Sequence, residues 1–285
     1  MATDNLVLGF GRGKVGDLVF YRREGQQITR ARNRAPKDPK TDKQLAQRCR
    51  ISGPMMMYRS MRKTLPLIGL WEYKKDHQTD YNNAVQLNMY SFTDFSTKQM
   101  AGANNVNWGN YYISQGSLKQ LVLYDTTDNW LLAPLQLTLA DLSTIATLSA
   151  ALIASANYAA GDELHFIQHY SLSIDNTYDA QAYRTLTTHV PDYWHEVKIV
   201  LNTTDTTTLE SLHIETRQGT TGAEFGYARF TGTSLAVQYG LVCRRKTTYG
   251  YNVSTCQLCR STAAGNIYQQ CYGDTAKAQS IASYK

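Results

Sequence analysis

Long apolar runs and an export signal are missing from this sequence. The 285 residues contain no run of about 18 apolar residues, so no membrane-spanning helix is expected. The first residues also lack a charged segment followed by a long apolar one, which argues against a secretory signal. The five cysteines are an odd number in a protein with no sign of export, and we expect no disulfides.

Catalytic signatures are missing as well. No G-x-S-x-G, H-E-x-x-H or phosphate-binding P-loop motif occurs. Gly11, Gly13 and Gly16 match G-x-G-x-x-G, but the strand-like segment at 17–21 follows them, whereas a dinucleotide fold requires a helix there. We therefore interpret these three glycines, with Gly25, as turn residues, and we expect a non-enzymatic protein that needs no cofactor.

Four cysteines near the C-terminus raise the alternative of a zinc site. The spacing C-x-x-C at 256–259 is that of a zinc knuckle. Both thiols are expected in one strand, however, where residues three apart point to opposite faces. Free thiols are therefore the favoured interpretation, and zinc is the alternative. The candidate zinc ligands are Cys243, Cys256, Cys259 and Cys271.

A second possible metal site lies on an expected strand. His165 and His169 share one strand face, near Asp162 and Glu163. Histidines on a strand face are more often ordinary polar partners than metal ligands, and we favour that interpretation.

Charge is distributed unevenly along the chain. Residues 1–75 hold 17 Lys and Arg and 6 Asp and Glu, a balance of +11, whereas residues 76–285 hold 12 and 17, a balance of −5. Parts of opposite sign can bind nucleic acid through the basic part, or can pack a basic arm against an acidic body in an oligomer. The hydrophobic share of 42% excludes global disorder.

The N-terminal segment predicts a hairpin followed by an extended arm. Strand-like runs at 18–22 and 27–32 flank Glu24 and Gly25, and Pro36 and Pro39 favour extended structure after them. An isolated hairpin is marginal in water, so this one must lie on its own body or on a neighbouring subunit. Its basic residues suit carboxylates across an interface or phosphates of a nucleic acid. They are Arg22, Arg23, Arg30, Arg32, Arg34, Lys37, Lys40, Arg48 and Arg50.

The remaining pattern predicts a few helices and then mostly strands. Thr41 is an expected N-cap with Gln44 at the capping-box position, and a second helix is expected to start at Pro54. Further helices are expected at 81–89, 138–154 and 276–284. Strands are expected at 118–123, 136–139, 163–172, 196–201, 210–216, 223–231, 237–246 and 252–258.

These elements predict a mainly β fold with a small α-helical N-terminal segment. The expected parts are a β-hairpin and extended basic arm at 1–40, a helical segment at 41–110 and a β-sandwich-like domain at 111–285.

Several short patterns carry a resemblance. They are GKVGDLVFY at 13–21, Arg30-x-Arg32, the pattern P-x-T-x-x-Q-x-x-Q-R at 39–48, ISQGSL at 113–118 and RRKTTYGYNVSTCQL at 244–258. Together they resemble an uncharacterised family encoded by Bacteroidetes bacteria and by phages and prophages. Asp38 stands where that family usually has Asn, and no catalytic residues are known in it.

The resemblance implies a structural protein of the virion, assembled in the cytoplasm of the bacterial host. We therefore expect a non-enzymatic bacteriophage structural protein that self-assembles through its hairpin and arm. Its expected partners are copies of itself and other virion proteins of the capsid, portal or tail. The alternative is a nucleic-acid-binding protein that uses the same basic arm.

Overall fold

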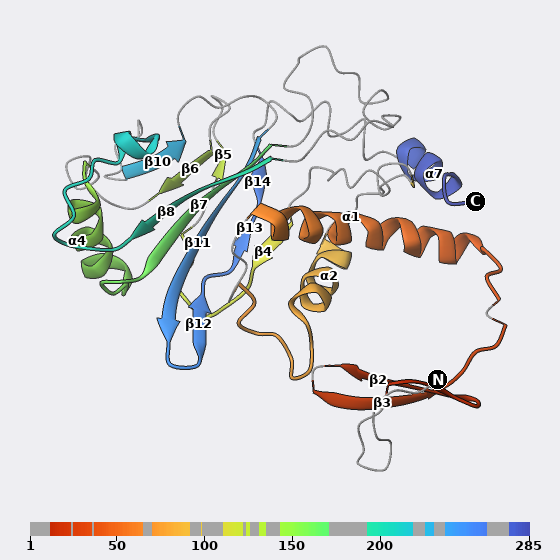
Figure 1. Cartoon of the computed structure of the whole chain (residues 1–285). Helices are drawn as coiled ribbons and strands as arrows, with labels where there is room; N and C mark the ends of the chain where they lie inside the picture. Colours follow the sequence, from red (N-terminus) through yellow and green to blue (C-terminus); the bar gives the residue numbers. More distant parts are fainter. Residues whose placement is uncertain are drawn as a thin grey trace.

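The protein is mainly β with a small helical part, as the sequence predicts (Figure 1). The structure is a computed structural model. It describes residues 12–23, 25–35, 37–64, 70–91, 98, 111–121, 124–125, 131–134, 143–170, 193–218, 226–230, 237–260 and 274–285.

A three-stranded antiparallel sheet comes first in the chain. Its strands are β1 (Gly13–Val15), β2 (Leu18–Arg23) and β3 (Gln26–Ala31), in the order β1-β2-β3. The predicted hairpin is therefore confirmed. Gly16 and Gly25 adopt the left-handed φ values of 54° and 77° that their turns require, which confirms them as turn residues. Gly13 is the first residue of strand β1, so its assignment as a turn residue is wrong, and Gly11 lies outside the described residues.

Helix α1 (Asp42–Thr64) is one continuous helix, although two were predicted. Its start is confirmed, because the Gln44 N–H donates to Thr41 Oγ1 at 3.4 Å and the Thr41 N–H donates to Gln44 Oε1 at 3.3 Å. The predicted break at Pro54 is wrong. Cys49 on one side of Pro54 and Met57 on the other are both fully buried. Packing on both sides offsets the interior proline, which costs a helix about 3 kcal/mol.

Two more helices pack beside α1. Helix α2 (Asp80–Ser91) confirms the helix expected at 81–89, and α7 (Asp274–Ala282) confirms the C-terminal one. The Tyr284 hydroxyl, just past α7, lies 3.0 Å from Ser52 Oγ of α1. Figure 1 shows α1 running between α7 and α2.

The largest sheet is antiparallel and has the order β12-β11-β7-β8, with β14 also paired to β11. Its long strands confirm the strands expected at 163–172, 196–201 and 237–246. The bounds are β7 (Glu163–Tyr170), β8 (Tyr193–Val200), β11 (Val237–Thr247), β12 (Gly250–Val253) and β14 (Cys259–Arg260).

This sheet is covered on both faces. Leu164 pairs with Ile199 and Cys243, and all three join one buried cluster with Leu148 and Leu152 of helix α4 (Ile145–Ala156). The alternate residues, such as Ile167 and Val242, join a second cluster with methionines of α1. The helical segment and the β body therefore share a core.

Helix α4 begins later than the sequence predicts. Thr144 is its N-cap, and the reciprocal capping box formed with Thr147 fixes the start. Asn157 ends the helix in the left-handed conformation at φ 59°. Most of the earlier part of the predicted helix, residues 138–142, lies outside the described residues.

A smaller sheet contributes to the first cluster. Its order is β5-β6-β10-β9, and Ile214 of β9 packs in the same cluster as Leu164, so the two sheets share a core as in a sandwich. Residues 210–212 form a 3₁₀ turn, η3 (Glu210–Leu212), where a strand was predicted. The strands are β5 (Tyr124–Asp125), β6 (Leu131–Pro134), β9 (Ile214–Gln218) and β10 (Gly226–Phe230).

Two predicted strands differ in the structure. Of the strand expected at 118–123, residues 118–121 are described and form no strand, because Leu118 makes only a single bridge to Ser254. The strand expected at 252–258 is broken after Val253. The chain then forms β13 (Cys256–Gln257), which pairs with β4 (Tyr112–Ser114) and leaves the large sheet. The strand expected at 136–139 lies outside the described residues.

Candidate interaction surface of the N-terminal arm

The β1–β3 sheet lies apart from both buried clusters. Within residues 12–23 and 25–35, no residue is buried. Val15 and Leu18, which pair across β1 and β2, are 48% and 44% exposed. A sheet of this size needs a covered apolar face to be stable, and none of the described residues buries a face of this one. Figure 1 shows the sheet below α2, joined to α1 by an extended segment.

Cross-strand register divides the side chains of this sheet into two faces. We call one of them the outer face, and it carries Val15, Leu18, Phe20, Arg22, Gln27, Thr29 and Ala31. The inner face carries Val19, Tyr21, Arg23, Gln26, Ile28 and Arg30. The outer face is apolar at Val15, Leu18 and Phe20 and polar at the end formed by Arg22 and Gln27. The inner face mixes apolar and basic groups, with the Arg30 guanidinium 5.7 Å from the centroid of the Tyr21 ring.

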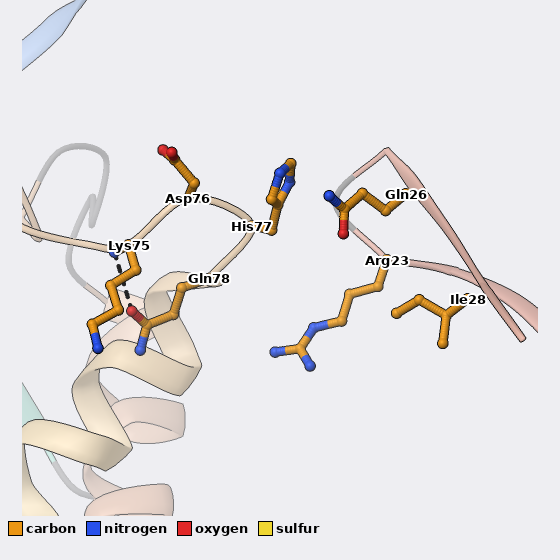
Figure 2. Close-up of a pocket in the computed structure, with 7 residues that line it drawn as sticks. All are labelled: Arg23, Gln26, Ile28, Lys75, Asp76, His77 and Gln78. Carbon is orange, nitrogen blue, oxygen red and sulfur yellow. Dashed lines mark hydrogen bonds between the residues drawn. The ribbon is translucent and has the colours of Figure 1, made fainter. Parts of the chain in front are cut away.

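The inner face approaches the loop before α2. Arg23, Gln26 and Ile28 line one side of an open pocket of about 260 Å³, and the loop at 75–78 lines the other (Figure 2). The loop is held by its own contact, because the Lys75 N–H donates to Gln78 Oε1 at 3.1 Å. Arg23 and Lys75 bring positive charge to this pocket, and Asp76 brings a negative charge.

The nine basic residues do not form one patch. They are spread over the β1–β3 sheet, the connecting arm and the start of α1, and the described arm residues are exposed. Arg34 Nε donates to Asp17 Oδ1 at 2.8 Å, and Arg48 Nη2 pairs with Asp38 Oδ1 at 2.7 Å. The hydrogen bond from Arg48 lowers the pKa of Asp38. These pairs link the arm to the β1–β2 turn and to α1, and they contribute little stability, since exposed ion pairs are weak.

The other residues of the basic set lie at separate places on the sheet, the arm and α1. Lys40 Nζ donates to the Lys285 carbonyl at 2.9 Å, which ties the end of the arm to the end of the described chain. Arg22, Arg23, Arg30, Arg32, Lys37 and Arg50 are all exposed.

Two of the later segments that carry the resemblance, at 113–118 and 244–258, contact each other in the fold. Ser114 Oγ donates to the Ser254 carbonyl at 2.8 Å, and the Cys243 N–H donates to Ser254 Oγ at 2.9 Å. Gly116 packs so closely on Val253 that no side chain fits. These motif residues therefore serve packing, and they line no described pocket.

Sequence reasoning did not identify Glu72, which links these two segments by hydrogen bonds. The Glu72 carboxylate accepts the N–H groups of Ser117 and Val253, each at 2.9 Å. Nothing in the sequence around Glu72 signals this role, because its partners come from segments far along the chain.

A cluster of charged side chains lies on the face of the large sheet opposite α4. Glu163 Oε2 accepts from Arg244 Nε at 2.6 Å, and Glu163 Oε1 pairs with Lys198 Nζ at 2.5 Å. Burial raises the pKa of Glu163, but the hydrogen bonds from Lys198 and Arg244 outweigh it and hold the pKa at about 2. Both ring nitrogens of His165 face carboxylates, those of Glu163 and Glu196.

The predicted polar role of the histidines is confirmed by this arrangement. His165 is engaged by two carboxylates, and His169 Nδ1 lies 3.2 Å from Gln238 Oε1 while its ring stacks on Trp194. Within the part of the chain that the structure describes, no three His, Cys, Asp or Glu residues are placed to hold a metal ion. The sequence placed Glu163 near His165. It did not show that Lys198 and Arg244 lie beside them, because the pairing of neighbouring strands in the sheet brings these residues together.

The cysteines considered for zinc do not come together where they are described. Cys243 and Cys256 belong to different buried clusters. Cys256 and Cys259 lie on different strands, β13 and β14, so the expectation that they share one strand is wrong. Burial raises the pKa of the Cys243 thiol to about 11, and the Tyr158 hydroxyl lies 2.9 Å from its Sγ. Cys271 lies outside the described residues.

None of the helices in the described ranges is both long and apolar enough to span a bilayer.

Comparison with known proteins finds no relative. No family model, no curated protein and no solved structure matches this chain.

Proposed function

We propose that this chain is a non-enzymatic structural protein of a bacteriophage particle and that it assembles through its β1–β3 sheet and arm. The observation that carries the proposal is the sheet at the N-terminus, which has no buried residue in its described range and an exposed apolar outer face. Such a sheet gains its stability from a partner that covers that face. The bacteriophage setting rests on the resemblance carried by the segments at 13–48, 113–118 and 244–258.

The arm suits attachment to a neighbour. Its described residues between Arg32 and Thr41 are exposed, and they contact the helical part through polar pairs, Asp38 with Arg48 and Lys40 with Lys285. Fully extended, residues 32–41 span roughly 30 Å, enough to carry the sheet to another subunit. The partners are other copies of this chain or other proteins of the particle.

Nucleic-acid binding is the second candidate, and the exposed arginines of the sheet favour it. Arg22, Arg23, Arg30 and Arg32 are all exposed, and contacts of this kind to phosphates are independent of sequence. Their affinity would fall steeply with salt, which separates this candidate from an interface built on apolar contacts.

The test is sedimentation of purified, nuclease-treated protein and of outer-face variants. We expect the wild type to form an oligomer and the double variant Val15→Thr/Leu18→Thr to shift to monomer, because it removes apolar contact area from the outer face. Tyr249→Ser is the matched control. It also removes an exposed apolar group, fully exposed at the turn between β11 and β12, and should leave the oligomer intact.

Two results would contradict the proposal. A wild-type monomer that gains mass only when DNA or RNA is added would support nucleic-acid binding instead. An oligomer that is unchanged in the double variant but lost in Tyr249→Ser would move the interface to the other end of the molecule.

A further inference from the structure

The N-terminal half of α1 carries buried residues that belong to neither buried cluster. Leu45 and Cys49 are both fully buried, yet neither is part of the two clusters of the β body. Together with Ser52, which is 3% exposed, they follow each other at helical spacing and form one stripe along the helix. We call these three residues the α1 stripe. Figure 1 shows this half of α1 extending away from the large sheet, so the cover of the stripe comes from elsewhere.

Helix α7 lies over this stripe. The Tyr284 hydroxyl donates to Ser52 Oγ at 3.0 Å, and Lys40 Nζ donates to the Lys285 carbonyl at 2.9 Å. These two contacts place the end of α7 against the stretch between residues 40 and 52, which holds the α1 stripe. Figure 1 shows α7 beside this half of α1.

The packing of α7 is thin. The helix is nine residues long, and a helix of this length depends on tertiary contacts to form. Within residues 278–285, Ser280 alone is buried, and Ile281 is partly buried. Helix α4, by contrast, buries Leu148 and Leu152 completely. Segments with few buried apolar contacts open locally while the rest of a protein stays folded.

We propose that α7 is a detachable strap, which leaves α1 as a unit while both buried clusters stay folded. Its departure exposes the α1 stripe at the base of the arm. The bond between Lys40 and the Lys285 carbonyl is exposed, so water replaces it at little cost. This inference goes beyond the proposed function, because it concerns α1 and α7 and does not involve the β1–β3 sheet.

Three buried cysteines make this opening measurable. Cys49 lies under the strap, whereas Cys243 and Cys256 lie in the two clusters, and all three are at most 2% exposed. The native protein is incubated with N-ethylmaleimide over a series of urea concentrations, and each site is followed by peptide mass spectrometry. We expect Cys49 to react at urea concentrations below the unfolding transition, and Cys243 and Cys256 to react only within it.

Two substitutions show whether α7 controls the reaction. Ile281→Ala removes apolar contact from α7 and should raise the rate of modification at Cys49 roughly tenfold, because that rate follows the population of the open form. Val200→Ala is the matched control. It also truncates an apolar side chain outside the buried clusters, at the end of β8, and should leave the rate at Cys49 unchanged. In both variants Cys243 should stay protected, which shows that the core is folded.

Either of two results would overturn the inference. If Cys49 reacts only together with Cys243 and Cys256, α7 does not open apart from the core. If Cys49 reacts early but at the same rate in Ile281→Ala and in wild type, something other than α7 covers the α1 stripe. Neither result bears on the outer face of the β1–β3 sheet, so the proposed function is tested separately.

Discussion

Replacing Gly116 with alanine tests whether the motif at 113–118 serves packing. An added Cβ would clash with the Val253 carbonyl oxygen and lie 2.5 Å from Glu72 Oε2 and 2.6 Å from Val253 Cγ2. The backbone oxygen has no room to retreat, because it accepts the Leu118 N–H at 2.9 Å. The substitution must therefore displace β12 from the segment that holds Gly116.

The cost of this displacement follows from two contributions. Overpacking of a tight site costs about 1–3 kcal/mol. Weakening the two backbone hydrogen bonds at Val253 adds about 1 kcal/mol each. We expect Gly116→Ala to lower the free energy of unfolding by roughly 3–5 kcal/mol, measured by urea denaturation followed by circular dichroism.

Gly161→Ala is the matched control for this prediction. Gly161 has open space around its Cα but a φ of 88°, so alanine there costs only about 1–2 kcal/mol of backbone strain. If Gly116→Ala costs no more than Gly161→Ala, the packing explanation of the motif is wrong, and a role in binding becomes the better interpretation.

Three further predictions follow from the charged and thiol groups. The folded pKa of Glu163, about 2, lies below its ordinary value of 4.5, so its stabilising effect is present above pH 4.5 and is lost as the pH falls toward 2. Urea denaturation should therefore show Glu163→Gln less stable than wild type at pH 7, with the gap narrowing as the pH falls from 4.5 toward 2; a constant gap would contradict the ion-pair account. Cys243 should resist alkylation at pH 8 in the native state and react in urea, as read by mass spectrometry, because burial raises its pKa to about 11. Equal modification in both states would show that its cluster is open. Arg48→Ala should change the free energy of unfolding by less than about 1 kcal/mol, because its ion pair is exposed, and a larger loss would show that the arm is anchored more firmly than the structure indicates.

Features determined by neighbouring residues could be predicted from the sequence. The turn around Gly25 and the capping box of Thr41 and Gln44 depend on residues a few positions apart, and both are confirmed. The helix expected to break at Pro54 does not, because buried side chains on both sides decide the outcome, and packing of that kind depends on the tertiary fold.

Features determined by sheet register could not be predicted. Glu163 and Lys198 meet because β7 and β8 pair with His165 opposite Lys198, and no local pattern fixes that alignment. The hydrogen bond from the Val253 N–H to the Glu72 carboxylate could not be predicted either, since the two residues come from distant parts of the chain. For the candidate surface, the sequence located the basic arm but could not show that none of the described residues of the N-terminal sheet is buried.

The most direct test of the central claim is the native mass of the nuclease-treated full-length protein, measured by light scattering in low and in high salt. The assembly account predicts a defined oligomer in both conditions, because contacts of the apolar outer face persist when charges are screened. A monomer in both conditions, which gains mass only when DNA or RNA is added in low salt, would contradict it.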